Sequence, residues 1–415
     1  MPWKESDVLE QKVRFVLDYE AGLWTMTELC ERDGISRPTG YELMRRFHEG
    51  GIAALEERSR APLHHPNASD EEIMQIVLAL RRAHPRWGPK KLRGHLERKY
   101  SQRKWPAAST IGDRLKAEGL AVPRRKRHKT PPYTQPFVSL DGPNQVWCAD
   151  FKGCFHARNG ERIDPLTMTD AYSRYLLRCQ IVDRMNTDQV QAVYVSAFRE
   201  YGMPLAIRSD NGAPFASRAI AGLSRLAVFL MKLDIVPERI EPGHPEQNGR
   251  HERMHRTLKE ETARPAQATR RAQQRAFDQF RQQYNEDRPH EALDQQTPAS
   301  HYLASPREFP ARLSIPEYEP GMQVRSVFPH GDFRWEGDRV FLSETLAGER
   351  IGLQFLDEDH WTIYFARFPI AILDSRKRRV GSLSRLEAAK LMVQRKGELP
   401  PSPAPHPQQL KPSSG

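Results

Sequence analysis

Apolar residues near the start of the chain recur every three or four positions, which is the spacing of one helix face. The pattern predicts an opening helix, a short helix capped by Thr27, and a further helix capped by Ser36. Gly34 stands between the last two, where glycine commonly ends a helix. Three side chains of the last helix are expected to face inward: Tyr41, Met44 and Phe47.

Two helices joined by a turn that contains glycine form the layout of a helix-turn-helix DNA reader. The helix after Ser36 carries Arg37, Arg45 and Arg46, which are candidate DNA contacts. An ordinary helical hairpin is the alternative, and the basic side chains favour the DNA reader. Residues 5–60 are therefore interpreted as a helix-turn-helix DNA-binding domain.

A second helical pattern covers residues 69–122, with Ser109 as the expected cap of its third helix. Over 81–104 there are ten Lys and Arg residues and a single acid. This excess of basic over acidic residues is larger than a solvent-exposed helix face needs. It predicts a second helical DNA-binding domain, with Lys90 and Lys91 as candidate contacts.

Residues 123–143 combine prolines with a basic run that includes Arg124 and Arg125. Such runs are usually solvated and mobile, and this one is also placed to follow a phosphate backbone. A nuclear-localisation signal is the alternative, which no other feature supports. The segment is interpreted as a basic linker.

Strand and helix patterns alternate over the next part of the chain, 144–303. Three strands precede the first helix, which indicates a mixed α/β fold. The expected strands cover 145–151, 166–170, 175–181, 205–209 and 235–240. The expected helices cover 187–201, 218–233, 245–261 and 269–284.

Short runs of β-forming residues at close, regular spacing occur over 320–383. Glycine-containing turns separate them, so this part predicts a small β-barrel. A short helix and a proline-rich, disordered tail are expected over 384–415.

The formal net charge of the 415-residue chain is +11, which favours a polyanionic partner such as nucleic acid. The four cysteines show no C-x-x-C pair, so free thiols in a reducing compartment are expected. No run of about 18 apolar residues and no signal peptide is found, so no membrane association is expected. The sequence predicts a cytoplasmic, nucleoid-associated protein.

Three acidic residues stand out by their context. Asp150 is near the end of an apolar strand, where an unpaired carboxylate is costly to bury. Asp210 follows another strand and opens a tight turn, and Glu246 stands where proline and glycine mark the start of a helix. Each has a plain alternative as a strand, turn or helix-end residue. Their joint contexts favour a shared metal site.

The helix after Glu246 carries Arg250 and Arg253 four and seven positions on, so these three side chains share one face. This face would place two cations beside a phosphate; an exposed Glu–Arg pair is the alternative. His251 and His255 are also four residues apart and could bind zinc, but no third ligand is near in sequence.

Three motifs make a resemblance plain: W-C-A-D-F at Asp150, S-D-N-G-A-P-F at Asp210, and P-G-H-P-E-Q-N-G-R at Glu246. They resemble the catalytic signatures of bacterial insertion-sequence transposases of the DDE type, which are related to retroviral integrases. The 35 residues between Asp210 and Glu246 match the D,D-35-E pattern of that group. Y-N-E-D-R-P-H-E-A-L, which begins at Tyr284, resembles the segment that closes the same core.

This resemblance implies a ribonuclease H-like core over 144–303, preceded by helix-turn-helix domains and followed by the small β domain. Asp150, Asp210 and Glu246 would be the catalytic residues and would hold two Mg²⁺ (or Mn²⁺) ions. The implied reaction is hydrolysis that frees a 3′-hydroxyl, followed by joining of that end to target DNA. The zinc-binding His/His/Cys/Cys unit of retroviral integrases is not found in this sequence, so zinc is not expected.

The implied partners are the double-stranded ends of a mobile element and a target duplex. Synapsis of two ends requires a homo-oligomer, at least a dimer. Whether a partner ATPase is needed stays undecided. Two rival interpretations are a DNA-binding regulator with an inactive core and a plain Mg²⁺ nuclease. The sequence does not reveal the end sequences or target preference, nor whether one or both strands are cut.

Overall fold

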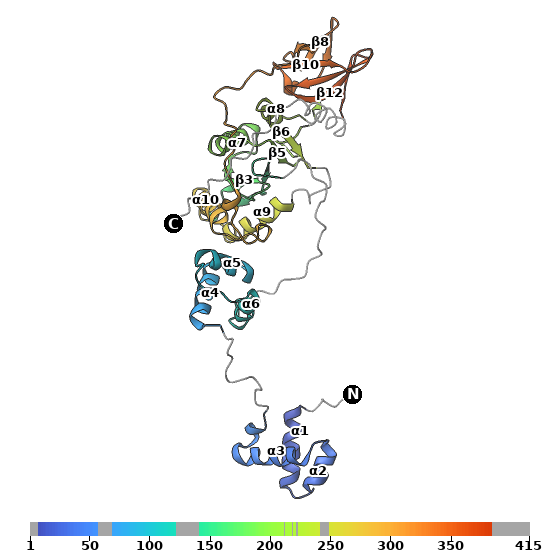
Figure 1. Cartoon of the computed structure of the whole chain (residues 1–415). Coiled ribbons are helices and arrows are strands. Elements are labelled where there is room, and N and C mark those ends of the chain that lie inside the picture. Colours follow the sequence, from blue (N-terminus) through green and yellow to red (C-terminus); the bar gives the residue numbers. More distant parts are fainter. Residues whose placement is uncertain are drawn as a thin grey trace, which may run out of the picture. The chain divides into compact units, whose positions relative to one another are not determined.

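The computed structural model of the chain describes residues 7–56, 69–121, 141–210, 212–217, 219–220, 223–240 and 249–383 (Figure 1). The chain divides into two compact units, Met1–Asp70 and Glu71–Gly415. Within the described part of the chain, no helix combines the length and the apolar character needed to cross a membrane.

The first unit is a bundle of short helices around one apolar core. Its helices are α1 (Val8–Glu20), α2 (Met26–Asp33), α3 (Arg37–Gly50) and the 3-10 helix η1 (Ile52–Leu55). The core gathers Phe15 and Val16 from α1, Leu29 from α2, and Leu43 and Met44 from α3. The structure thus has the helix, turn and helix that the apolar spacing predicts.

The turn between α2 and α3 follows from its local chemistry. Gly34 adopts the left-handed conformation that ends α2, and the Ser36 side chain caps α3 by accepting from the backbone N–H of Thr39. The expected cap at Thr27 is wrong, because Thr25 forms a reciprocal capping box with Glu28.

One side chain of α3 departs from the expected pattern. Tyr41 is 57% exposed, whereas Met44 is buried and Phe47 packs at the edge of the core. The inward face of α3 instead passes through Gly40, whose missing side chain leaves room for Met26 of α2. The inward position of α3 is therefore a glycine, which the spacing of apolar residues does not indicate.

The second unit begins with three helices, α4 (Glu71–Ala83), α5 (Pro89–Lys99) and α6 (Ala108–Ala117). They share a core built from every helix and from the connections between them, including Leu78, Trp87, Leu92 and Ile111. Ser109 does not cap α6, because the helix already begins at Ala108. Two of the basic residues of 81–104 bond to the backbone: Arg81 donates to the oxygen of Trp87, and Arg98 donates to the oxygen of Asp287.

A mixed six-stranded sheet follows, in the order β2-β3-β1-β5-β6, with β4 paired to β3. Strand β3 pairs antiparallel with both β1 and β4, whereas β5 pairs parallel with both β1 and β6. The strands are β1 (Val146–Phe151), β2 (Phe155–His156), β3 (Arg162–Asp170), β4 (Leu176–Val182), β5 (Ala206–Ser209) and β6 (Val236–Arg239). Each strand expected between 145 and 240 is present, and the two-residue β2 is an addition.

Helices cover both faces of this sheet, because alternate strand residues are apolar. In β4, Leu177 belongs to a core with α7 and α8, whereas Leu176 belongs to a core with α9 and α10. The helices are α7 (Thr187–Tyr201), α8 (Arg225–Lys232), α9 (Gly249–Thr262) and α10 (Arg270–Glu286), followed by the 3-10 turns η4 (Glu291–Leu293) and η5 (Pro298–His301). The helix expected over 218–233 is shorter than predicted, because Ser224 caps α8.

The described C-terminal part, which ends at residue 383, contains only strands and the 3-10 turn η6 (Glu344–Leu346). Its strands are β7 (Gln323–Ser326), β8 (Asp332–Trp335), β9 (Asp338–Phe341), β10 (Arg350–Phe355), β11 (His360–Phe365), β12 (Phe368–Asp374) and β13 (Arg379–Ser382). They form an open sheet in the order β13-β12-β11-β10-β7 and a separate β8-β9 hairpin. The expected small barrel is not confirmed, since these sheets do not close among the described residues. The short helix and tail expected over 384–415 lie outside the described residues.

Helix α8 is buried on two sides. Leu226 and Leu230 pack into the core of the mixed sheet, whereas Ala227 and Val228 pack with the C-terminal strands. The ammonium of Lys232 at the end of α8 also lies 2.5 Å from a carboxylate oxygen of Glu349. The mixed sheet and the C-terminal strands therefore share this helix.

Candidate active site

Asp150 lies near the end of β1, and Asp210 comes directly after β5, the parallel neighbour of β1. Strands β1 and β5 pair with Cys148 beside Arg208, so the same register carried two residues further brings Asp150 level with Asp210. Carboxyl ends of adjacent parallel strands are a common place for functional side chains. The two acids, far apart in sequence, thus meet at one edge of the sheet.

The Asp210 turn is built around its own carboxylate. The Asp210 Oδ1 atom accepts a hydrogen bond of 3.1 Å from the backbone N–H of Gly212. A Cβ at Gly212 would lie 3.1 Å from the same carboxylate, which is a tight contact. The glycine of S-D-N-G thereby holds the acid in place.

Asp150 is costly to ionise in these surroundings. Burial raises the pKa of Asp150 to about 7, and the nearby carboxylate of Asp210 adds to the rise. Glu252 acts in the same direction, while Lys152 and a backbone hydrogen bond oppose it. A bound cation would remove this penalty, so the pair fits a divalent metal with oxygen ligands.

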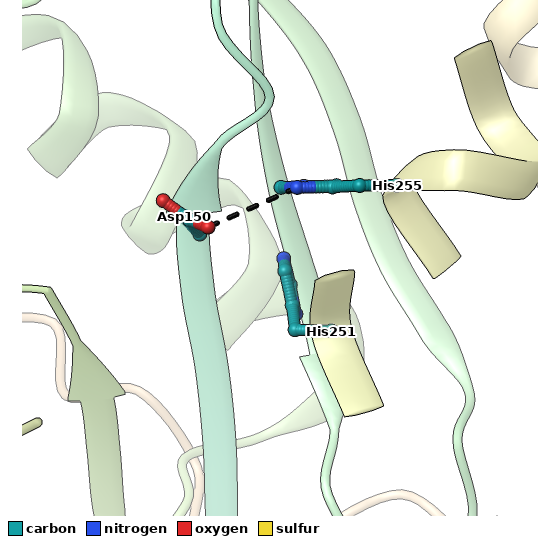
Figure 2. A group of neighbouring side chains, drawn as sticks. All are labelled: Asp150, His251 and His255. Atoms are coloured by element: carbon teal, nitrogen blue, oxygen red, sulfur yellow. Dashed lines mark ion pairs between the residues drawn. The ribbon is translucent and has the colours of Figure 1, made fainter. Parts of the chain in front are cut away.

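A compact polar network lies beside Asp150, where α9 packs on β3 and β1 (Figure 2). The hydroxyl of Thr167 lies 2.7 Å from Nε2 of His251, 2.6 Å from Nε2 of His255, and 3.0 Å from the backbone oxygen of Asp150. The Thr169 hydroxyl lies 2.8 Å from Nδ1 of His251. One side of α9 is thus tied to β3, the neighbour of the strand that carries Asp150.

His255 also faces the acid itself. Its Nδ1 atom lies 3.8 Å from Oδ2 of Asp150, and Figure 2 shows the ring directed at the carboxylate. Burial lowers the pKa of His251 to about 3 and, with His251 and Lys152, lowers that of His255 still further. Both imidazoles are therefore neutral at physiological pH.

Lys152 and Tyr194, which lie near the two acids, also have shifted pKa values. Burial lowers the pKa of Lys152, which is partly buried. Burial raises the pKa of Tyr194, and the carboxylates of Asp210 and Asp150 add to the rise. Among the described residues the buried Tyr194 hydroxyl has no hydrogen-bond partner.

The structure describes only part of the third predicted motif. Glu246 lies outside the described residues, and α9 begins three positions after it. Arg250 belongs to α9 by its backbone, but its side chain is not described. Arg253 is exposed on the same helix.

The candidate DNA contacts differ in their surroundings. Arg37 is exposed at the start of α3, whereas Arg45 pairs with Glu42 and Glu49 on the same helix. Arg46 donates to the backbone oxygen of Glu56.

Lys90 and Lys91 lie on α5, and Lys90 is 3.4 Å from a carboxylate oxygen of Glu291. Arg124 and Arg125 lie outside the described residues.

Sequence reasoning missed Thr167 and Thr169 altogether. Their signal is an alternation of threonines on one face of a strand that is otherwise apolar and buried. The spacing of His251 and His255 is visible in the sequence, but the third side chain near them proved to be Asp150. All three bring a ligand atom within 4.8 Å of one another.

Comparison with known families gives matches along most of the described chain. The integrase core domain family matches residues 141–245, and a second integrase core domain family matches 233–298. A helix-turn-helix domain family matches 11–62, and a homeodomain-like domain family matches 39–115.

Two relatives come from bacterial insertion elements. The chain is 30% identical over 264 residues to the insertion element IS407 uncharacterized 31.7 kDa protein of Burkholderia multivorans, covering 61% of this chain and 87% of that protein. It is 26% identical to the insertion element IS476 uncharacterized 39.2 kDa protein of Xanthomonas euvesicatoria, covering 62% and 71%.

The chain is also similar to two solved structures at low TM-score. The HTLV-2 integrase catalytic core domain in complex with magnesium has a TM-score of 0.31 and 15% identity, covering 39% of this chain and 99% of that one. The simian T-cell lymphotropic virus intasome has a TM-score of 0.35 and 15% identity, covering 69% and 91%.

The relatives and the integrase core match establish the family, and the helix-turn-helix matches agree with the helical bundles that precede the core. The chain belongs to the bacterial insertion-sequence transposases with an integrase-like catalytic core.

Proposed function

We propose that this transposase cleaves the ends of its mobile element by Mg²⁺-dependent hydrolysis and joins the freed 3′ ends to target DNA. The observation that carries the proposal is the pairing of Asp150 with Asp210 at the ends of parallel strands, where burial and mutual repulsion raise the pKa of Asp150. Such a pair favours a divalent cation with oxygen ligands.

The proposal assigns Glu246 as the third acid, on the strength of its motif and its spacing from Asp210. Two Mg²⁺ ions held by the three acids would activate the attacking oxygen and stabilise the leaving one. Arg250 and Arg253 follow Glu246 at helical spacing and would hold the phosphates of the donor end.

Recognition of the element ends is assigned to the helical parts of the chain, 5–60 and 69–122, with the basic linker 123–143 along the DNA backbone. Exposed Arg37 at the start of α3 supports this assignment, since the first turn of a recognition helix commonly reaches base edges. Bringing two ends together requires at least two copies of the chain. Chromosomal DNA as substrate places the reaction in the cytoplasm at the nucleoid.

Labelled DNA from both flanks of the reading frame tests the proposal, with the full chain and Mg²⁺. Asp150→Asn, Asp210→Asn and Glu246→Gln should each abolish cleavage and joining while binding of the end survives. Asp188→Asn, an exposed acid in the first turn of α7, serves as the matched control and should stay active. Strand transfer by any of the first three variants would refute the assignment.

The products also separate the rival functions. A plain nuclease yields cut ends and no joined product, whereas a DNA-binding regulator yields neither although it binds the same ends. Joined products from the unaltered chain that require Mg²⁺ would exclude both rivals.

A further inference from the structure

The Thr167 hydroxyl has three polar partners, and their chemistry fixes where the protons lie. One partner is the backbone oxygen of Asp150, which can only accept, so it receives the single hydroxyl proton. The two lone pairs of the hydroxyl remain for Nε2 of His251 and Nε2 of His255. Both histidines must therefore carry a proton on Nε2.

The two histidines then differ at their other ring nitrogen. Nδ1 of His251 lies 2.8 Å from the hydroxyl of Thr169, which can donate to it. Nδ1 of His255 instead lies 3.8 Å from Oδ2 of Asp150 (Figure 2). An unprotonated imidazole nitrogen and an ionised carboxylate oxygen are both acceptors, and 3.8 Å is too long for a hydrogen bond between them. The two atoms therefore repel each other unless a metal ion lies between them.

We propose that Nδ1 of His255 and Oδ2 of Asp150 bind one divalent transition ion together, of the Mn²⁺ or Co²⁺ class. Two ligand atoms held about 2.1 Å from one ion lie at most about 4.2 Å apart, and the observed separation falls inside that limit. This inference rests on the proposed function, in which Asp150 already holds a catalytic metal.

The surroundings of His255 match those of a metal-binding histidine. Such a histidine usually donates its second ring N–H to a fixed acceptor, which sets the tautomer and the ring orientation. Thr167 is that acceptor here, 2.6 Å from Nε2, and it is itself anchored on the backbone of Asp150. The ring is thereby held by the same residue that supplies the other ligand.

A nitrogen ligand changes which ions the site prefers. Mg²⁺ favours oxygen ligands, whereas imidazole suits transition ions. His255 should therefore strengthen binding of Mn²⁺ and Co²⁺ more than binding of Mg²⁺. The chain would use Mg²⁺ through its carboxylates and still bind Mn²⁺ more tightly than an all-oxygen site.

Pulsed electron paramagnetic resonance of the full chain with Mn²⁺ alone tests the direct bond. The unaltered protein should show coupling between Mn²⁺ and an imidazole nitrogen. His255→Gln should lose the coupling, because glutamine keeps a donor for Thr167 but has no counterpart of Nδ1. His251→Gln is the matched control and should keep it, because Nδ1 of His251 already faces Thr169.

Calorimetric titration adds a second readout. His255→Gln should weaken Mn²⁺ binding about tenfold or more and Mg²⁺ binding far less. Asp150→Asn should weaken both, which locates the ion at Asp150. Circular dichroism confirms that each variant is folded; if His255→Gln does not fold, the spectrum of the unaltered protein decides.

Two results would overturn the inference. One is Mn²⁺ bound at Asp150 without imidazole coupling, and the other is equal loss of coupling in both histidine variants. A protein that joins DNA ends with Mg²⁺ but lacks the coupling would keep the proposed function and refute only the nitrogen ligand.

Discussion

Arg208 and Glu238 form a buried ion pair, with 2.9 Å between a guanidinium nitrogen and a carboxylate oxygen and side-chain exposures of only 8% and 9%. The pair links β5 to β6 two residues before Asp210. Burial raises the pKa of Glu238, and the guanidinium of Arg208 opposes that rise. The strand that presents Asp210 therefore depends on a charge balance inside the protein.

Arg208→Met should lower the free energy of unfolding by about 3–5 kcal/mol, because it leaves the Glu238 carboxylate buried without its partner. Urea unfolding measures the loss. The double variant Arg208→Met/Glu238→Met should lie closer to the unaltered protein, since no charge is then stranded. Lys116→Met, which breaks an exposed pair with Asp113, should cost under about 1 kcal/mol. Equal losses in Arg208→Met and Lys116→Met would contradict the prediction.

The raised pKa of Asp150 predicts a pH dependence of the metal-free protein. An acid whose folded pKa lies above its unfolded value stabilises the fold below the unfolded pKa, and that stability is lost as pH rises through the folded pKa. For Asp150 the window runs from 3.8 to about 7. Within this window the contribution of Asp150 to the free energy of unfolding falls by about 1.4 kcal/mol per pH unit.

The measurement compares Asp150→Asn with the unaltered protein in the presence of a chelator. The stability advantage of the asparagine variant should grow between pH 4 and pH 7, about the window given above, and then level off. Added Mn²⁺ should reduce that advantage by binding the ionised carboxylate. A constant advantage across this range would show that Asp150 titrates normally.

The Thr167 hydroxyl should matter more than its methyl group. Thr167→Val keeps the shape but leaves two histidine N–H groups and the Asp150 carbonyl without this partner, at about 1–3 kcal/mol per buried group. Thr167→Ser retains the hydroxyl and should stay nearer the unaltered protein. Chemical unfolding of the two variants provides the comparison, and a serine variant no more stable than the valine variant would argue against the network.

The cations of α3 should not contribute equally to DNA binding. Arg37 has no ion pair among the described residues, whereas Arg45 lies 2.8 Å from Glu42 and 3.1 Å from Glu49. Arg37→Ala should therefore weaken binding of the element end more than Arg45→Ala, and it should lower the salt dependence by about one phosphate contact. Affinities measured over a salt series decide, and a larger effect at Arg45 would reverse the assignment.

The sequence predicts the mixed sheet well, because its strands are short apolar runs bounded by turns. The helix over 187–201 agrees at both ends with α7, whose cap is Asn186. The helix expected over 218–233 begins only at Arg225, because Ser224 caps α8. The spacing of apolar residues alone does not show which of these two helices begins where the pattern begins.

The site was predictable only in part. Asp150 and Asp210 stand out because strand ends and turn residues mark them, and the structure brings them level. The links from Thr167 to His251 and His255 join residues more than eighty positions apart, which no local pattern reveals. The same holds for β8, whose charged residues conceal a strand with buried Phe333 and Trp335.

Helix α8, buried on both sides, restricts how this architecture can evolve. One row of its side chains fits the mixed sheet and the next row fits the C-terminal strands. Recombination that exchanged the C-terminal strands between relatives would have to bring the matching row of α8 with it. The crossover point would then fall inside the catalytic core itself, so the two parts are inherited together although their folds are distinct.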